Sequence, residues 1–182
     1  MNRLQKSGSK TAFGLIDYDN GNNHESSVIS ILGNKKRYSI ENYILDPIFI
    51  AFFILREIEN KKLEFGFDDY DKITNFQKIG KEKLQNIVDK IIIKIEPNIS
   101  NLYNSEIVSY RTLNDYIIKV PIWYFKTKGH ILEEIILKSI YDLRGFMEKN
   151  SICPTITKKV VNIIPEFIAL DLLKTFEELE YK

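Results

Sequence analysis

The strongest pattern in the chain is a helical repeat of apolar residues that starts after Lys81 and stops at Pro97. Its apolar positions lie three or four residues apart over three turns, which predicts an amphipathic helix that ends at the proline. The same spacing predicts a helix close to 132–143 and another that starts at Pro165. The apolar residues that define these three helices are, in chain order, Leu84, Ile87, Val88, Ile91, Ile92 and Ile95; Leu132, Ile135, Ile136, Ile140 and Leu143; and Ile168, Leu172, Phe176 and Leu179.

A further helix is expected from about residue 47 to about residue 60. Asp46 can cap its N-terminus, and Pro47 suits the first turn because the N–H that proline lacks would be unpaired there anyway. An uninterrupted apolar run follows, from Ile48 to Leu55. These side chains surround the helix axis rather than forming one stripe, so we expect this helix to be buried on most sides.

Short apolar runs bounded by turn-forming residues predict strands elsewhere in the chain. The first run, 11–16, leads into a cluster of Asp, Asn and Gly residues, and the second, 28–32, is closed by a Gly-Asn pair. The segments 106–111 and 115–120 flank a turn and are typical of a hairpin. Strands come first and mostly helices follow, so the predicted class is α/β or α+β, with a small sheet and a helix-rich C-terminal part.

The composition favours one domain spanning residues 1–182. A chain of this length buries roughly two thirds of its unfolded surface, so it needs no metal ion or disulfide for stability. The sequence has 26 Lys and Arg residues against 25 Asp and Glu, a net charge of +1. Near-neutrality argues against a general surface for polyanions, so any contact with nucleic acid is expected to be a local patch.

The sequence predicts a cytoplasmic protein without membrane contact. Residues 1–10 lack the apolar core of a signal peptide. The longest uninterrupted apolar run, Ile48 to Leu55, is far shorter than the roughly 18 residues that span a bilayer. The single cysteine, Cys153, cannot form an intramolecular disulfide, which favours a reducing compartment.

The sharpest candidate for chemistry follows the first expected strand and reads Gly14-Leu-Ile-Asp17-Tyr-Asp19. Side chains two residues apart in an extended chain lie on the same side, so both carboxylates can point at one cation beyond the sheet edge. Proteins commonly hold Mg²⁺ with one or two carboxylates together with phosphate and water oxygens. The pattern predicts a metal site, although aspartates in a turn after a strand are also ordinary in proteins.

A second segment follows about twenty residues later and reads Arg37-Tyr-Ser-Ile-Glu41-Asn-Tyr-Ile-Leu-Asp46-Pro. Together the two segments resemble the Toprim domain of bacterial overcoming-lysogenization-defect (OLD) nucleases. They are more closely similar to related bacterial proteins that are often encoded beside, or fused to, ABC-type ATPases. In those proteins a strand ending G-L-I/V-D-x-D precedes a segment R-Y-x-I-E-N-Y-L-L-D-P. The resemblance covers about residues 12–60 and continues more loosely near 120–130 and 164–167.

The resemblance implies a small, partly parallel Toprim-like sheet within a core of about 11–60, and a helix-rich part of about 61–182 that contains the hairpin. It further implies a nuclease that depends on Mg²⁺ (or Mn²⁺), acts on DNA or RNA and serves in phage or plasmid defence with an ATPase partner. The implied site residues are Asp17 and Asp19 as metal ligands, Glu41 and Lys128 as catalytic groups, and Lys36 and Arg37, beside Lys35, as a short positive patch for the substrate backbone. The chemistry is consistent, because a divalent ion polarises the scissile phosphate and a cation stabilises the developing charge.

One feature of the Toprim pattern is missing. Toprim domains carry an essential Glu after their first strand, tens of residues before the Asp-x-Asp pair, whereas the sixteen residues before Asp17 contain no Glu. Three explanations remain open: the chain is the C-terminal part of a longer protein, a partner subunit of a homo-oligomer supplies the Glu, or the site is degenerate. Glu25, in the loop after the aspartates, is a candidate replacement for the missing Glu, supported only by its proximity to them. We therefore infer an incomplete Toprim-like domain. A non-catalytic module that docks on an ATPase partner, and phosphoryl transfer on a small nucleotide, remain as alternatives.

Simpler interpretations exist for several of these residues. Glu41 fits equally well in the first turn of a short helix, where a negative charge is favoured. His130 suits a local cap or packing role better than catalysis, and Cys153 lacks an identifiable His partner, so it is expected to be structural. Two distant histidines and one cysteine provide no zinc-ligand set. The chain has no Gly-rich phosphate loop and is not itself the ATPase.

Overall fold

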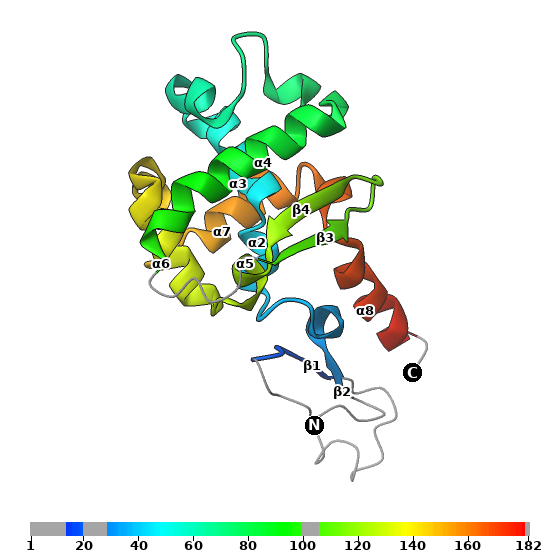
Figure 1. Ribbon diagram of the computed structural model, residues 1–182. Helices are drawn as coiled ribbons and strands as arrows, with labels where there is room; N and C mark the ends of the chain where they lie inside the picture. The colour runs from blue at the N-terminus through cyan, green and yellow to red at the C-terminus, as the bar shows by residue number, and fades with distance from the viewer. Residues whose placement is uncertain (1–13, 20–28, 100–105, 181–182) are drawn as a thin grey trace.

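The computed structural model describes residues 14–19, 29–99 and 106–180 (Figure 1). It is a helix-rich α/β structure with two small sheets, as the sequence predicts. The strands are β1 (Gly14–Ile16), β2 (Ile29–Ile31), β3 (Ile107–Arg111) and β4 (Ile117–Pro121). The α-helices are α2 (Glu41–Ile44), α3 (Pro47–Glu57), α4 (Lys81–Ile95), α5 (Ile122–Lys126), α6 (Gly129–Ser139), α7 (Cys153–Ile156) and α8 (Leu170–Glu180).

Helix α3 is the centre of the hydrophobic core, which confirms the prediction of a helix buried on most sides. All residues from Pro47 to Leu55 are buried. The side chain of Asp46 accepts a hydrogen bond from the backbone N–H of Ile48 at 3.0 Å, so the predicted N-cap is present. The ring of Phe52 packs edge-on against Phe76, with ring centroids 4.9 Å apart. The core therefore forms around the one helix whose sequence has no polar face.

Helix α4 packs on α3 with the apolar face that its periodicity predicts. The six apolar positions that the periodicity defines, from Leu84 to Ile95, are all buried, whereas Ile93 on the opposite face is exposed, and the helix ends just before Pro97. Residues 64–80 are expected to be irregular because they show no periodic pattern; short 3₁₀ segments lie at Glu59–Phe65 and Ile73–Lys78. Local spacing was sufficient for α4, because its apolar positions lie on one face of the helix and Pro97 ends the pattern.

The strands pair as two separate two-stranded sheets. Strand β1 pairs with β2 in parallel, with Gly14 opposite Ile29, and this pair lies at one end of the molecule, away from α3 and α4 (Figure 1). Strands β3 and β4 form the predicted antiparallel hairpin, with Tyr110 opposite Ile118. The expected first strand began at residue 11, and its residues 11–13 lie outside the described ones.

The C-terminal helix begins later than its sequence predicts. Pro165 opens only a 3₁₀ turn (Pro165–Phe167), Ile168 is extended, and α8 starts at Leu170. The backbone carbonyl of Ile168 accepts a hydrogen bond from Leu113 of the β3–β4 turn at 3.0 Å. Because this tertiary bond holds the chain extended, the predicted continuous helix is wrong over these residues. The helix expected over 132–143 likewise ends at Ser139.

Two short helices were not predicted from the sequence. Helix α5 follows β4 directly, and α7 continues into a π-helical turn at Thr157–Val161. Both are too short for a periodic pattern to be visible.

One buried apolar cluster joins the two parts of the chain that the sequence resemblance separates. It contains residues from Leu32 to Ala169, and α2 of the first part packs on α6 of the second. Among the described residues, no helix is long and apolar enough to cross a membrane. Helix α8 contacts β2, and the residues that lead into α2 contact the loop after β1. This second junction holds the candidate site.

Candidate functional site

Asp17 and Asp19 lie in the loop directly after β1, as predicted. The Oδ1 atom of Asp17 accepts a hydrogen bond from the backbone N–H of Ile40 at 3.0 Å. The backbone N–H of Asp19 donates to the carbonyl of Tyr38 at 3.1 Å, and Asp19 adopts a left-handed φ of 47°. These two bonds attach the aspartate loop to the segment that leads into α2.

The carboxylate of Asp17 lies in an unfavourable electrostatic environment. Its pKa is raised above the ordinary value, mainly because burial removes water, and further because the charges of Glu41 and Asp19 are close; the bond from Ile40 opposes the change. Like charges that raise the pKa of a neighbouring carboxyl group mark a position where a cation would be stabilised. The structure therefore brings together the three carboxylates that the sequence singled out.

Glu41 lies at the first residue of α2 and is held in place from two sides. The hydroxyl of Ser39 donates to its Oε2 at 2.5 Å. Gly129, the first residue of α6, packs so closely that a Cβ there would lie 2.8 Å from the same Oε2 atom. Lys128 immediately precedes this glycine and is exposed. The close approach of Gly129 to the Glu41 side chain thus places the backbone of Lys128 near this acidic residue.

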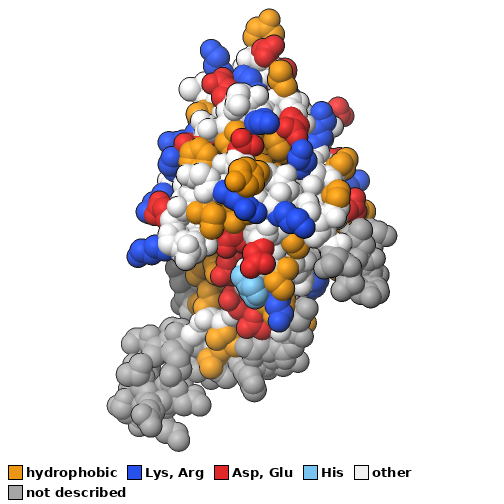
Figure 2. Space-filling view, turned by 90° about the vertical axis from the view of Figure 1, so that its left-hand side faces the viewer, with side chains coloured by type: hydrophobic (Ala, Val, Ile, Leu, Met, Phe, Trp, Pro, Cys, Tyr) orange, Lys and Arg blue, Asp and Glu red, His pale blue; other side chains and the backbone are white. Residues whose placement is uncertain are grey.

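A fourth carboxylate, Glu133, was not singled out by the sequence. Its Oε1 accepts hydrogen bonds from the Ser151 hydroxyl at 2.7 Å and from the Ile152 N–H at 2.5 Å. Glu133 lies four residues after Gly129, on the same face of α6. Figure 2 shows acidic side chains gathered in one region of the molecular surface. The only sequence signal for Glu133 is this i, i+4 spacing, which identifies a helix face but not what the face contacts.

Cys153 is buried beside these carboxylates. Burial raises the pKa of its thiol to about 12, with added contributions from the negative charges of Glu133 and Glu41. A thiol with so high a pKa is a poor nucleophile at neutral pH. The structural role expected from the sequence fits this environment.

The raised pKa predicts that native Cys153 is protected from alkylation. At pH 8 we expect iodoacetamide to react at least about a hundredfold more slowly with the folded protein than with the protein in urea, because the thiolate is scarce and the side chain is buried. Mass spectrometry over time measures both rates. Similar rates in the two states would show that Cys153 is accessible and ionised, and would contradict the described environment.

The three basic residues expected to form one surface patch are in different environments. Arg37 is only 1% exposed, whereas Lys36 is exposed. Arg37 Nη1 donates to Asp46 Oδ2 and to the backbone carbonyl of Asn42, both at 2.8 Å. Its guanidinium carbon lies 4.2–4.6 Å from the centroids of three aromatic rings, those of Tyr43, Tyr110 and Phe125. Arg37 is therefore not on the exterior beside Lys36, and a role in binding the substrate backbone stays a prediction.

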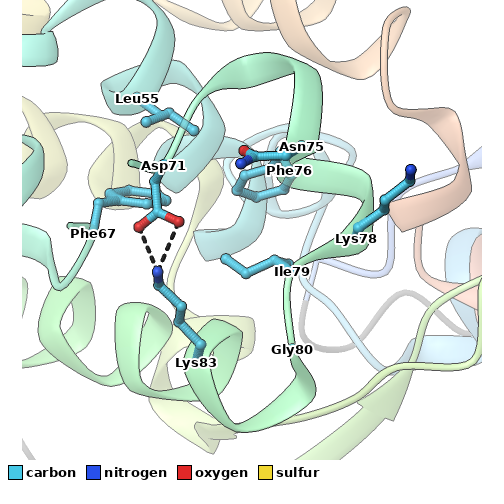
Figure 3. A pocket seen from close by; sticks show the side chains of 9 residues that line it. All are labelled: Leu55, Phe67, Asp71, Asn75, Phe76, Lys78, Ile79, Gly80 and Lys83. Carbon is cyan, nitrogen blue, oxygen red and sulfur yellow. Dashed lines mark hydrogen bonds and ion pairs between the residues drawn. The ribbon is translucent and has the colours of Figure 1, made fainter. Parts of the chain in front are cut away.

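Two cavities are lined by charged side chains and differ in whether they contain residues singled out from the sequence. One, of about 310 Å³, lies beside Lys83, whose ammonium group is paired with Asp71 (Figure 3). It contains none of the residues singled out from the sequence. The other, of about 340 Å³, is lined by Arg37, Lys36 and Lys126 among others. The second cavity adjoins the aspartate loop, because the ammonium group of Lys126 lies 4.9 Å from the ring centroid of Tyr18.

The described residues contain no group of three or more His, Cys, Asp or Glu side chains arranged to hold a metal ion. A cation at Asp17 would thus be held by fewer protein ligands, with the remaining oxygens from water or substrate. Glu25 lies outside the described residues. No family model matches the chain, and neither a curated protein nor a solved structure matches it.

Proposed function

We propose that this protein is a Toprim-like, OLD-related nuclease domain that cleaves DNA or RNA with the help of a divalent metal ion, in bacterial defence together with an ABC-type ATPase. One observation carries the proposal. Asp17 and Asp19 follow a strand of a parallel pair, and Glu41 is close enough to raise the pKa of Asp17. This arrangement concentrates negative charge at the carboxyl end of a strand, where α/β proteins commonly bind ligands.

The donor set is suited to Mg²⁺ or Mn²⁺. Carboxylate oxygens are the ligands that these hard ions prefer, and Mg²⁺ commonly takes one or two of them while keeping water and substrate oxygens. When bound, the ion would supply Lewis-acid activation of the phosphate. Asp17 and Asp19 would bind it, while the exposed ammonium groups of Lys128 and Lys36 would stabilise charge on the substrate phosphates.

Asp17→Asn is expected to weaken metal binding and abolish cleavage without unfolding the protein. The amide oxygen can still accept the bond from the N–H of Ile40, whereas the charge that attracts the cation is gone. We expect at least a tenfold loss of Mn²⁺ affinity by calorimetry and loss of cleavage of plasmid DNA or tRNA. The raised pKa of Asp17 also predicts that metal affinity falls on acidification, starting at a higher pH than for an ordinary Asp, since protons then compete with the ion.

Asp69→Asn is the matched control for this experiment. Asp69 is exposed and belongs to the segment before α4, at the opposite end of the molecule from β1 (Figure 1). The Asp69→Asn variant removes the same charge at a position far from the proposed site, so metal binding and cleavage should stay at the level of the unmodified chain. If Asp17→Asn and Asp69→Asn bind metal and cleave equally well, the proposed nuclease site is wrong.

The alternative is a non-catalytic Toprim-like module that docks on an ATPase partner. It is motivated by one sequence observation: residues 1–16 contain no counterpart of the Glu that precedes the Asp-x-Asp pair in the Toprim pattern. Under this alternative the pure chain cleaves no substrate at any concentration of Mg²⁺ or Mn²⁺. Cleavage by the unmodified chain that Asp17→Asn eliminates would exclude it.

A further inference from the structure

Arg37, which lines the second cavity, carries two buried hydrogen-bond donors that the described chain does not satisfy. Nε and Nη2 of Arg37 have no hydrogen-bond partner, although the side chain is 1% exposed. Buried polar groups in folded proteins are almost always paired, because a buried donor without a partner loses its hydrogen bonds to water and gains none in return. An arginine with one satisfied end and one unsatisfied edge is therefore unusual and indicates a binding role.

Arg37 lines the cavity, and only one end of its guanidinium is satisfied by the described residues. The satisfied end, Nη1, bonds to Asp46 and to the carbonyl of Asn42, and neither residue lines the cavity. Aromatic rings pack against the guanidinium, so its remaining edge is the one available to a ligand. Nε and Nη2 donate in parallel, which matches two oxygens of a phosphate or carboxylate group.

The charge of the lining favours an anion. Lys35, Lys36 and Lys126 line the cavity together with Arg37, against a single carboxylate, Asp171. That carboxylate already accepts a hydrogen bond from the hydroxyl of Tyr43 at 2.8 Å. Burial lowers the pKa of Lys126, so its ammonium form is stabilised less by water than usual and would gain from a bound anion.

The remaining wall is apolar and comes from the hairpin and α5. Val108, Ile122 and Phe125 line it, and the cavity volume of about 340 Å³ falls in the range of sites for small organic molecules. A doubly charged phosphate suits several cations and a two-pronged arginine better than a singly charged carboxylate does. The apolar wall would contact the uncharged body of the same ligand.

We propose that this cavity binds the phosphate group of a phosphorylated molecule, with the Nε–Nη2 edge of Arg37 and the Lys126 ammonium as its ligands. The phosphate belongs either to a small molecule such as a nucleoside monophosphate or to the end of a nucleic-acid strand. The inference goes beyond the proposed nuclease function and does not rest on it, because it requires neither a metal ion nor the Asp17 loop.

Ser109→Glu tests the proposal without touching the buried arginine. Ser109 lines the cavity from the exposed side of β3, so a new carboxylate there should repel an anion while leaving the core intact. Calorimetry in EDTA would use inorganic phosphate, a nucleoside 5′-monophosphate, and an oligonucleotide with or without a 5′-phosphate. We expect one site per chain and at least tenfold weaker binding in Ser109→Glu. Ser109→Gln, of the same size but uncharged, should bind like the unmodified chain.

A second pair of variants keeps the test independent of Ser109. Lys126→Gln should weaken phosphate binding at least fivefold, whereas Lys138→Gln, which removes an exposed charge of α6 outside the cavity, should not change it. Tighter binding of the monophosphate than of either oligonucleotide assigns a small molecule, and preference for the 5′-phosphorylated oligonucleotide assigns a strand end. Equal phosphate affinity in Ser109→Glu and Ser109→Gln, or no binding of any phosphorylated probe, would overturn the proposal. Because EDTA removes metal ions, these outcomes are separate from failure of the nuclease site.

Discussion

Asp46→Ala is expected to lower the free energy of unfolding by about 3–5 kcal/mol, because it leaves the buried charge of Arg37 without its counterion. The Asp46 carboxylate, 2% exposed, makes the 2.8 Å ion pair with Arg37 Nη1. It also accepts hydrogen bonds from the Tyr110 hydroxyl at 2.6 Å and from the N–H of Ile48 at 3.0 Å. One substitution therefore removes a counterion, the partner of a buried hydroxyl and the cap of the central helix. Urea unfolding followed by circular dichroism measures the loss.

Two further variants make the result for Asp46 interpretable. Glu64→Ala breaks an ion pair with Lys94 in which both side chains are more than 40% exposed, and it should cost less than about 1 kcal/mol. Asp46→Asn retains a cap acceptor but not the charge, so its stability should fall between those of Asp46→Ala and the unmodified chain. If Asp46→Ala lowers the free energy of unfolding no more than Glu64→Ala does, the buried ion pair does not stabilise the protein as described.

Gly33→Ala is expected to lower the free energy of unfolding by about 2–4 kcal/mol, because the position is both left-handed and crowded. Gly33 has a φ of 58°, and a Cβ there would lie 1.5 Å from the Tyr43 hydroxyl oxygen. That hydroxyl donates to Asp171 of α8, and the N–H of Gly33 donates to Thr175 of the same helix. Displacing Tyr43 would therefore weaken the attachment of α8 to the body. Thermal unfolding monitored at 222 nm would record the change.

Gly145→Ala is the matched control for Gly33. A Cβ at Gly145 would meet no atom within 4 Å, and its φ lies outside the left-handed region. We expect its stability to differ from that of the unmodified chain by less than about 1 kcal/mol. Equal effects of the two substitutions would mean that the approach of Tyr43 to Gly33 does not determine stability.

The elements that the sequence predicted well are those whose folding depends on their own residues. Helix α4 has one apolar face and a terminating Pro97, and α3 has a cap at Asp46, so local patterns were sufficient for both. The hairpin β3–β4 pairs adjacent segments and was also found. The segment after Pro165 was predicted wrongly, because hydrogen bonds from the distant β3–β4 turn hold it extended.

The candidate site was predictable only in part. The spacing of Asp17 and Asp19 after an apolar run identified two of its carboxylates, and the segment around Glu41 added a third. Glu133 and the cavity beside Arg37 were missed, since both depend on how α6, α5 and the hairpin pack against the first part of the chain. Sequence spacing describes one element at a time and contains no information about such contacts.

The sequence by itself determined the helix-rich α/β class, the buried central helix and the acidic loop after the first strand, because periodicity, caps and turns act within a few residues. Only the tertiary structure decided which charges are buried. It placed Arg37 against Asp46 in the interior rather than beside Lys36 on the exterior. Burial of a charge depends on the summed packing of many residues far apart in the chain, and each ion pair forms only where that packing brings its partners together.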